Sequence, residues 1–549
     1  MARTTRLLIG SAVLACTSCL GAASAQELPT QPNILLIVAD DMGYSDVGAY
    51  GGEIATPNID ALAETGVMFT DFHANATCSA TRAMLLTGMD NHLTGMGRQR
   101  GTPAAAHVRA GYEQALSDRA ATLPEVLRDA GYRTIMAGKW HLGSAWEQQP
   151  QNRGFDHSSV FLEGAGAHYK QEIMGIRDDS GFTFMRDGKF VDVPDDYYST
   201  DYFTDQLIHD IGNGSDHEPF FAYAAYTAPH WPLQAPEEDI TPYVGKYDDG
   251  WEALASRRIA RQKELGLLPE NYPQTRPFER TPQWDDLDAD QKKIDAREMA
   301  VYAGMVTHLD RQIGRLLDHL KQIGEYDNTL IIFMSDNGAE GGRRPNQDWV
   351  TKHFDNSLDN IGHRNSFITY GPGWAQAGMV SDRMFKLTPY DGGTHVPAVF
   401  NFPSSFPARR TDVYGSVTNI MPTLLDIAGA DQPGIRFEGR DVFPMEGAPM
   451  TDYLEGESDQ LHGADHVYGY ELHQFATLRK GKWKILYDPK EKSPQWHLYD
   501  MSQQMPERND LASKQPKVMQ DMLLSFRDWA STHNVGLNDD YTPRDAVIP

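Results

Sequence analysis

One segment of the sequence combines a nucleophile, a cation and the signals of a helix start. Residues 77–88 read T-C-S-A-T-R-A-M-L-L-T-G, which places Cys78 where a helix should begin and Gly88 where it should end. Arg82 follows Cys78 by four residues and therefore lies on the same helix face, one turn away. Free N–H groups and a partial positive charge favour anions at a helix N-terminus. We predict that Arg82 binds a tetrahedral anion there; a buried structural cysteine beside a surface arginine is the alternative.

Two pairs of side chains with oxygen atoms lie at the ends of predicted buried strands. The run N-I-L-L-I-V-A-D-D ends in Asp40 and Asp41, and the run N-T-L-I-I-F-M-S-D ends in Asp336, which Asn337 follows. Such oxygens suit a hard cation such as calcium or magnesium, and open α/β sheets bind ligands at the carboxyl ends of their strands. Acids after a strand also commonly cap helices, and either pair taken alone favours that interpretation.

Two lysines and two histidines complete the set of residues that could do chemistry. The heptapeptide A-G-K-W-H-L-G places Lys139 and His141 two residues apart, so both point to the same side of an extended segment. His230 lies in P-H-W-P-L after another predicted strand, and Lys386 precedes D-G-G-T-H-V-P. Each histidine taken alone is more typical of a structural residue, whereas their occurrence together with the other motifs favours a catalytic site.

These motifs together resemble those of the type I sulfatases. The segment at Cys78 matches C-x-P/A-x-R followed by L-T-G, with Ala80 where most members have proline. G-K-W-H-L-G and P-H-x-P are also family motifs, and D-G-G-T-H-V-P resembles E-G-G-x-R-V-P with Asp391 for glutamate and His395 for arginine. We transfer no role to those two substituted positions. The resemblance runs from about residue 33 to about 511 and is closest to bacterial arylsulfatases, within the alkaline-phosphatase superfamily.

The resemblance implies a modified residue, a metal and a substrate class. In the family the cysteine is oxidised to formylglycine before export by a formylglycine-generating or maturase enzyme, and calcium is the usual ion. The implied substrate is a small sulfate monoester, with aryl sulfates favoured. The implied metal ligands are Asp40, Asp41, Asp336, Asn337 and the modified Cys78, and the implied catalytic residues are Cys78, Arg82, Lys139, His141, His230 and Lys386.

The expected chemistry explains why a plain thiol is not enough. A sulfated thiol or alkoxide would need water to attack sulfur a second time. A hydrated aldehyde carries two hydroxyls on one carbon: one attacks sulfur, and the other, once deprotonated, expels sulfate and restores the aldehyde. We expect His230 to protonate the leaving alcohol and His141 to act as the base for the second step.

The N-terminus predicts export. Arg3 and Arg6 precede an apolar run from Leu7 to Leu20, and A-S-A ends at Ala25, which indicates a signal peptide over residues 1–25 and a periplasmic or secreted protein. No later apolar run reaches the length of about 18 residues that a membrane span needs. Cleavage after Ala25 would therefore leave a protein without a membrane segment, although a lipoprotein variant stays open.

Cysteine content and charge narrow the function further. Of three cysteines, Cys16 and Cys19 leave with the signal, so Cys78 cannot form a disulfide within its own chain. A single cysteine in an oxidising compartment is either a quiet buried thiol or a residue kept for its chemistry. The formal net charge of −27 argues against nucleic acid or an anionic membrane as a partner.

The pattern along the 549 residues predicts an α/β protein. Apolar runs alternate with helical patterns, which favours a mostly parallel central sheet with helices on both faces. Short alternating segments near the end indicate a small antiparallel C-terminal module. The expected domains are the catalytic domain at 26–445 and the module at 446–549; the expected strands are 33–41, 219–226, 328–336, 466–472 and 482–487, the helices 56–66 and 300–320, and a surface insertion 239–291.

Two other functions remain open at this point. A phosphonate monoester or phosphodiester hydrolase of the same superfamily would share the fold, the metal and the formylglycine. An exported metal-binding protein without catalysis would keep Cys78 as a thiol, but it would explain neither Arg82 and Lys139 nor His230 and Lys386. A sulfatase accounts for all of these residues.

Overall fold

A computed structural model describes residues 1, 31–99, 109–175, 182–214, 218–343, 348–463 and 465–544. Apart from Met1, the predicted signal peptide lies outside the described residues.

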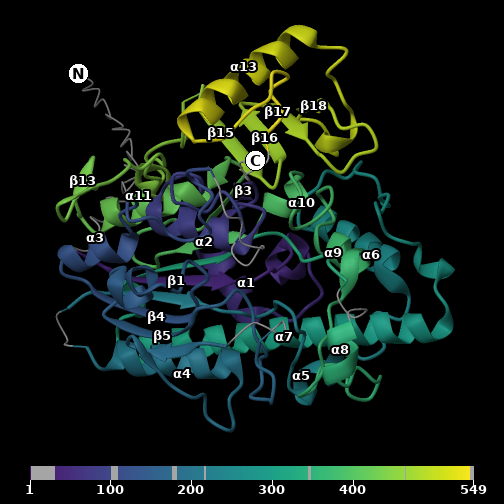
Figure 1. Ribbon diagram of the computed structural model, residues 1–549, viewed down its shortest axis with the longest axis horizontal. Helices are drawn as coiled ribbons and strands as arrows, with labels where there is room; N and C mark the ends of the chain where they lie inside the picture. Colours follow the sequence, from purple (N-terminus) through teal and green to yellow (C-terminus); the bar gives the residue numbers. More distant parts are fainter. Residues whose placement is uncertain are drawn as a thin grey trace.

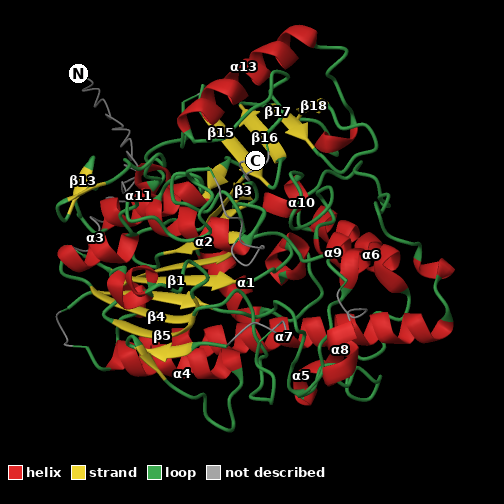
Figure 2. Cartoon of the chain, viewed as in Figure 1, coloured by secondary structure: helices red, strands yellow, loops and turns green. Residues whose placement is uncertain are grey.

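A ten-stranded sheet forms the centre of the molecule (Figures 1 and 2). In sheet order its strands are β11 (Arg409–Thr411), β2 (Val67–Phe69), β10 (Ala398–Asn401), β9 (Thr329–Ser335), β1 (Asn33–Ala39), β8 (Phe220–Ala225), β4 (Arg133–Lys139), β5 (His157–Phe161), β6 (Phe184–Arg186) and β7 (Lys189–Phe190). The five strands from β9 to β5 run parallel, so their carboxyl ends meet at one edge. This arrangement confirms the predicted fold class.

Helices cover both faces of the sheet and create two hydrophobic cores. Successive side chains of β1 point to opposite faces, so Leu35 and Ile37 join one core while Leu36 and Val38 join the other. The first face carries α1 (Pro57–Thr65), α4 (Ser199–Gly212) and α7 (Ala289–Gln322), and the second carries α2 (Cys78–Thr87), α3 (Leu123–Asp129) and α11 (Ile420–Ile427).

A second, four-stranded antiparallel sheet lies in the region predicted for the C-terminal module. Its strands are β15 (Val467–Leu472), β16 (Phe475–Lys480), β17 (Trp483–Tyr487) and β18 (Trp496–Asp500). The helix α13 (Pro516–Thr532), which the sequence analysis did not predict, covers this sheet through Met522, Phe526 and Trp529 (Figure 1). The module therefore has a hydrophobic core of its own. The boundary at residue 445 stays a prediction.

The remaining elements are short or lie around the sheet edges. They are the helices α5 (Glu237–Ile240), α6 (Gly250–Glu264), α8 (Asp348–His353), α9 (Gly371–Gly378), α10 (Asp391–Thr394) and α12 (Thr451–Glu455), and the strands β3 (Phe72–His73), β12 (Gly415–Ser416), β13 (Arg436–Phe437) and β14 (Arg440–Asp441).

The segment 239–291, expected to be a surface insertion, is partly core. It forms α6, whose Trp251 is fully buried with its ring centroid 4.9 Å from that of Trp284 and 5.6 Å from that of Trp374. Large aromatic side chains bury much apolar area, so α6 contributes to the stability of the domain. A charge-rich and proline-rich composition concealed this apolar helix face.

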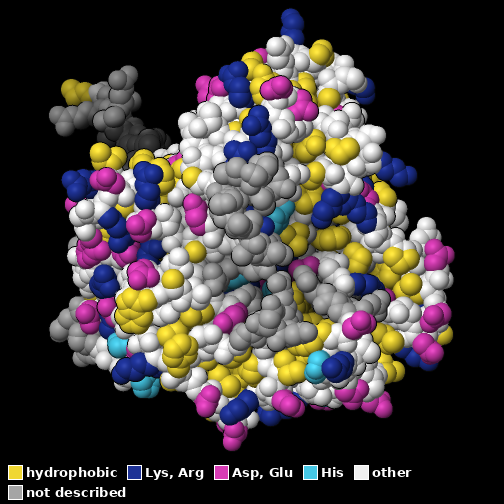
Figure 3. All heavy atoms as spheres, in the orientation of Figure 1, with side chains coloured by type: hydrophobic (Ala, Val, Ile, Leu, Met, Phe, Trp, Pro, Cys, Tyr) yellow, Lys and Arg dark blue, Asp and Glu magenta, His cyan; other side chains and the backbone are white. Residues whose placement is uncertain are grey.

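Charged side chains of both signs lie on the surface (Figure 3). Acidic and basic side chains are interspersed over the face drawn in Figure 3, although the net charge is −27. Among the described residues, none of the helices is both long and apolar enough to cross a membrane.

Candidate active site

Cys78 is the first residue of α2, at the end of the helix that faces the carboxyl edge of the sheet. Thr77 is the N-cap residue, and Gly88 ends the helix with a φ of 65°. Cys78 and Arg82 are both buried, with 1% and 0% of their surface exposed. Arg82 donates from Nε to Oδ2 of Asp336 at 2.9 Å and from Nη1 to the carbonyl of Lys139 at 3.1 Å. The alternative of a surface arginine is therefore wrong.

The two predicted oxygen pairs meet because their strands are neighbours. Ala39 pairs with Ser335 at the ends of β1 and β9, so Asp40 and Asp41 emerge beside Asp336 and Asn337. The N–H of Asp41 donates to Oδ1 of Asp336 at 3.3 Å, and Nδ2 of Asn337 donates to Oδ1 of Asp41 at 2.7 Å. Parallel pairing thus brings together oxygens that lie about 300 residues apart in the sequence.

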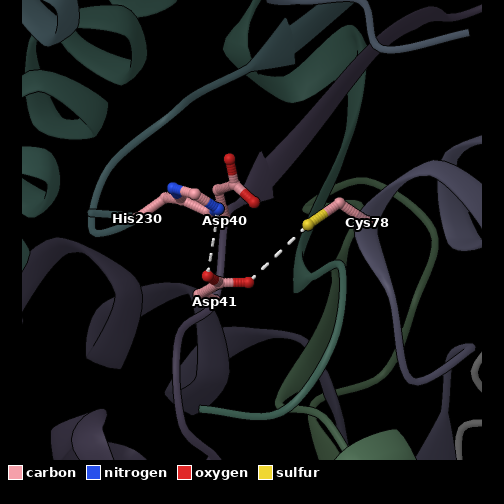
Figure 4. A group of neighbouring side chains, drawn as sticks. All are labelled: Asp40, Asp41, Cys78 and His230. Carbon is pink, nitrogen blue, oxygen red and sulfur yellow. Dashed lines mark hydrogen bonds and ion pairs between the residues drawn. The ribbon is translucent and has the colours of Figure 1, made fainter. Parts of the chain in front are cut away.

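Cys78 and His230 join the aspartates in a compact cluster. One ligand atom each from Asp40, Asp41, Cys78 and His230 lies within 4.8 Å of the others, and all four residues are buried (Figure 4). Asp41 lies between Cys78 and His230. Its Oδ1 is 3.7 Å from Sγ of Cys78, and its Oδ2 is 3.4 Å from Nε2 of His230. Such a donor set could hold a metal ion.

Two buried oxygens test whether a hard cation fits. Oδ2 of Asp41 and Oδ1 of Asn337 have no hydrogen-bond partner within the described residues. Buried acceptors are normally satisfied, and these two come from the two pairs predicted as ligands. The residues therefore fit an oxygen-coordinated cation such as calcium.

Two buried lysines form ion pairs with the aspartates. Nζ of Lys139, at the end of β4, donates to both oxygens of Asp40 at 2.7 and 3.0 Å, and Nζ of Lys386 donates to Oδ1 of Asp41 at 2.5 Å. Burial disfavours the charged form of Lys386, but Asp41 and the other acids outweigh burial and hold its pKa well above the usual value. Positive charge is thus concentrated where an anionic ester would bind.

The two predicted histidines are held in defined orientations. His141 has a φ of 58°, and its ring lies so close to Gly164 that a Cβ there would be 2.5 Å from Nε2. Nδ1 of His230 donates to the carbonyl of Trp231 at 2.6 Å, which leaves Nε2 to face Asp41. Burial, followed by the charges of Lys386 and Lys139, holds the pKa of His230 well below its usual value.

The chain is similar to known proteins over most of its length. A family model described as Sulfatase matches residues 32–430. The chain belongs to the sulfatase family. An uncharacterized sulfatase of Schizosaccharomyces pombe is 42% identical over 528 residues, which cover 91% of this chain and 94% of the relative. An arylsulfatase of Klebsiella aerogenes is 38% identical over 437 residues, which cover 78% of this chain and 93% of the relative.

Solved structures agree with this assignment. The crystal structure of Ps i-CgsB in complex with k-i-k-neocarrahexaose has a TM-score of 0.64 and 26% sequence identity, and the match covers 92% of this chain and 93% of that one. Membership of the family makes this sulfatase a sulfuric ester hydrolase, as the sequence predicted.

Two residues of the sulfatase site were missed by sequence reasoning. His168 is buried and pairs through Nε2 with the carbonyl of His230 at 2.9 Å, while burial lowers its pKa to about 4. Glu340 is 6% exposed, and its Oε2 lies 3.4 Å from Nζ of Lys386. No motif marks His168, whereas the acid in D-N-G-A-E could have been noticed three residues after Asn337.

Of the two substituted family positions, Asp391 contacts the C-terminal module, whereas His395 contacts Asp382 outside it. Asp391 accepts a hydrogen bond at 2.6 Å from Lys484 of β17, and the pairing with Lys484 helps to lower the pKa of Asp391, against burial, to about 2. His395 lies 3.0 Å from Asp382. Neither contact reaches Cys78.

Proposed function

We propose that this sulfatase is an exported arylsulfatase-type enzyme that hydrolyses sulfate monoesters with a formylglycine made from Cys78 and with one calcium ion. The observation that carries the proposal is the burial of Cys78 at the start of α2, 3.7 Å from Asp41 and beside the buried cations Arg82, Lys139 and Lys386. Three buried cations beside a single buried cysteine can contact the oxygens of an anionic ester.

The environment of Cys78 makes the unmodified thiol a poor nucleophile. Burial, followed by the charge of Asp336, raises the pKa of the thiol well above its usual value. The unmodified side chain would therefore stay a neutral thiol, which is a weak nucleophile. The hydrated aldehyde instead offers one hydroxyl for attack on sulfur and a second for release of the sulfate.

Calcium bound by Asp40, Asp41, Asp336, Asn337 and the modified residue 78 would supply Lewis acidity and a lowered pKa for a bound hydroxyl. Arg82, Lys139 and Lys386 orient the ester sulfate and neutralise the charge that builds up on its oxygens. These residues do not need to move far, because each already contacts the site in the folded protein.

The two histidines move the protons. Nε2 of His230 is the unprotonated nitrogen of the neutral ring, because Nδ1 donates to the carbonyl of Trp231. We therefore propose that Nε2 takes the proton of the attacking hydroxyl and passes it to the leaving alcohol as the bond between sulfur and the ester oxygen breaks. His141 then removes the proton of the second hydroxyl of residue 78, the bond between its carbon and the sulfate oxygen breaks, and the aldehyde is restored. Water rehydrates the aldehyde for the next turnover.

Maturation and export complete the proposal. A formylglycine-generating or maturase enzyme would act on the unfolded segment at Cys78, because the residue is buried once the chain has folded. The signal peptide at residues 1–25 would then direct the chain to the periplasm or the medium. We propose no nucleic-acid partner and no membrane attachment after cleavage.

Mass spectrometry of the Cys78 peptide, with a hydrazine probe for the aldehyde, tests the modification directly. Cys78→Ala should lose turnover by several orders of magnitude, because it removes the nucleophile, and it should still bind phenyl sulfate where the four remaining ligands retain calcium. A folded Cys78→Ala protein with near wild-type activity would refute the mechanism.

Comparing kcat/KM for matched sulfate and phosphorus esters tests which class of ester is the substrate. We expect kcat/KM for an aryl sulfate to exceed that for the corresponding phosphate monoester, phosphodiester and phosphonate. A tenfold preference for phosphorus esters, equivalent to about 1.4 kcal/mol in activation free energy, would favour the phosphonate or phosphodiester hydrolase instead.

A further inference from the structure

The fixed charges of the site nearly cancel. Four carboxylates, those of Asp40, Asp41, Asp336 and Glu340, surround three cations, Arg82, Lys139 and Lys386. With the imidazoles neutral, one negative charge is in excess. A bound divalent cation would turn this into an excess of one positive charge, which matches an ester group that carries a single negative charge.

Glu340 is the carboxylate in this set to which the proposed function gives no task. Its Oε1 accepts a hydrogen bond from the N–H of Gly342 at 2.7 Å, so its orientation is fixed. Its Oε2 lies 3.4 Å from Nζ of Lys386, whose own N–H donates to the carbonyl of Ala339 at 3.0 Å. Backbone and side-chain contacts therefore hold the Glu340 charge beside the lysine that faces the substrate.

We propose that Glu340 is a specificity-determining residue whose fixed negative charge adapts the site to a monoanionic ester group and disfavours a dianionic one. This proposal rests on the function proposed above. Sulfate and phosphate monoesters have the same tetrahedral shape, so shape does not separate them. Charge does, because a phosphate monoester gains its second negative charge above a pKa of about 6, whereas a sulfate monoester keeps one. A buried carboxylate repels the second charge strongly, since the surroundings screen it poorly.

The test compares phenyl sulfate with phenyl phosphate at pH 8, where the phosphate is a dianion. In Glu340→Gln the ratio of kcat/KM for phosphate to that for sulfate should rise at least tenfold. Glu340→Asp, which keeps the charge, should retain the wild-type ratio. Glu125→Gln is the matched control: Glu125 is a buried carboxylate of α3 whose charged partners are Arg153 and Arg440 instead of Lys386.

A pH series adds a readout that a structural role would not change. In the wild type, the phosphate-to-sulfate ratio should fall as the pH rises through about 6, because the dianion replaces the monoanion. In Glu340→Gln this fall should be weaker. Equal losses for both substrates, with an unchanged pH dependence of the ratio, would overturn the proposal and leave Glu340 as a support for Lys386 only.

Binding distinguishes failure of this inference from failure of the proposed function. Calorimetry in a Cys78→Ala background measures the affinities for phenyl sulfate and phenyl phosphate without turnover, and elemental analysis verifies equal calcium content. Glu340→Gln should raise the affinity for phenyl phosphate relative to phenyl sulfate at least tenfold. An unchanged affinity ratio refutes the role of Glu340 even if the wild type cleaves phenyl sulfate. A wild type that cleaves no sulfate ester refutes the proposed function instead.

Discussion

At the scale of single residues, the site converges on Asp41. Its Oδ1 accepts hydrogen bonds from Asn337 at 2.7 Å and from Lys386 at 2.5 Å. Its Oδ2 has no hydrogen-bond partner among the described residues and lies 3.4 Å from Nε2 of His230. One oxygen can therefore orient the lysine while the other binds a cation, so Lys386 and a metal can share this carboxylate.

If Asp336 is a calcium ligand, its replacement should reduce calcium content and activity together. Asp336→Asn keeps the size of the side chain but removes a charged ligand, so calcium content and activity should fall together, each by tenfold or more at limiting calcium. Elemental analysis of the folded variant measures the first quantity, and wild-type protein stripped with a chelator and then reloaded provides the reference. Full calcium occupancy in Asp336→Asn would show that this aspartate is not a ligand and serves Arg82 alone.

The general-acid role of His230 predicts a dependence on the leaving group. General acid catalysis contributes about 10²- to 10⁴-fold, but it matters only when the leaving oxygen is basic. His230→Ala should therefore slow unactivated phenyl or alkyl sulfates far more than nitrophenyl sulfate. A plot of log kcat/KM against leaving-group pKa should be steeper for the variant, provided that ester cleavage limits the rate. Parallel lines would leave His230 as a binding residue and make Lys386 or His141 the acid to test.

The sequence predicted these residues unequally well. The rule that parallel strands end at one edge suggested a cation site at the pairs Asp40–Asp41 and Asp336–Asn337, whereas their assignment as metal ligands came from the resemblance. Lys386 came from the resemblance alone, because no local pattern connects it to Asp41. Glu340 and His168 act through contacts with other site residues; no motif marks His168, whereas the position of Glu340 shortly after Asn337 was a signal that could have been used.

At the scale of elements, site residues occupy the points where regular structure ends. Asp41 follows β1 with a φ of 67°, and His141 follows β4 with a φ of 58°. Met384 and Leu387, on either side of Lys386, both have a φ of 63°. The left-handed region costs a residue with a side chain about 1–2 kcal/mol, so the surrounding packing must hold these turns in place. Chain direction thus changes sharply at or beside Asp41, His141 and Lys386.

Replacing Gly138 within β4 tests whether the placement of this strand determines the position of Lys139. Gly138 has a φ of 120°, and a Cβ there would lie 1.9 Å from the carbonyl oxygen of Ala225 on β8. Gly138→Ala should push the two strands apart, lower the stability by several kcal/mol and abolish activity. Gly131→Ala is the control: its φ is 91°, nothing lies within 4 Å of the new Cβ, and only the backbone cost of about 1–2 kcal/mol should appear. Thermal unfolding and an arylsulfate assay of both variants measure the difference. Equal effects would mean that β4 tolerates displacement at this position.

Element boundaries show where sequence reasoning stops. The apolar spacing over residues 300–320 predicted α7 without its first third. The helix begins at Ala289 because the Asp288 side chain accepts hydrogen bonds from the N–H groups of Asp290 and Gln291. Residues 289–299 are mainly polar and show no regular apolar stripe. Capping therefore determined the start of a helix that the hydrophobic pattern alone could not locate.

At the scale of the whole molecule, the C-terminal module reaches the region next to α2. Ala76, two residues before Cys78, packs against Tyr470, Leu472 and Phe475 of β15 and β16. A cavity of about 350 Å³ lies between the two domains nearby, lined on one side by His73 and Asn75, among others, and on the other by β15 to β17. Because this cavity occupies part of the junction, polar contacts between its two sides contribute more to holding the module in place. The sequence predicted the module but not its docking, because contacts between distant segments leave no periodic signal.

A buried histidine across this junction predicts how the docking depends on pH. His92 donates from Nδ1 to Asp90 at 2.7 Å and from Nε2 to Glu471 of β15 at 2.9 Å. Burial opposes its charge, but Asp90 and Glu471 outweigh burial and raise its pKa to about 9. Because the folded pKa lies above the unfolded value of about 6.5, the stabilisation is complete below pH 6.5 and is lost as the pH rises through 9.

The size of this effect is on the order of 3 kcal/mol, since each pKa unit corresponds to about 1.4 kcal/mol. Urea unfolding of the wild type and His92→Asn at pH 6, 7.5 and 9.5 should show a difference in unfolding free energy that is largest at pH 6 and shrinks by pH 9.5. Any constant cost of leaving Glu471 with fewer partners cancels in this comparison between pH values. His209→Asn is the control, because the His209 side chain is 64% exposed and its replacement should have a small effect at every pH. A difference for His92→Asn that stays the same from pH 6 to 9.5 would show that His92 is neutral in the folded protein, and that the domains are held together without this charge.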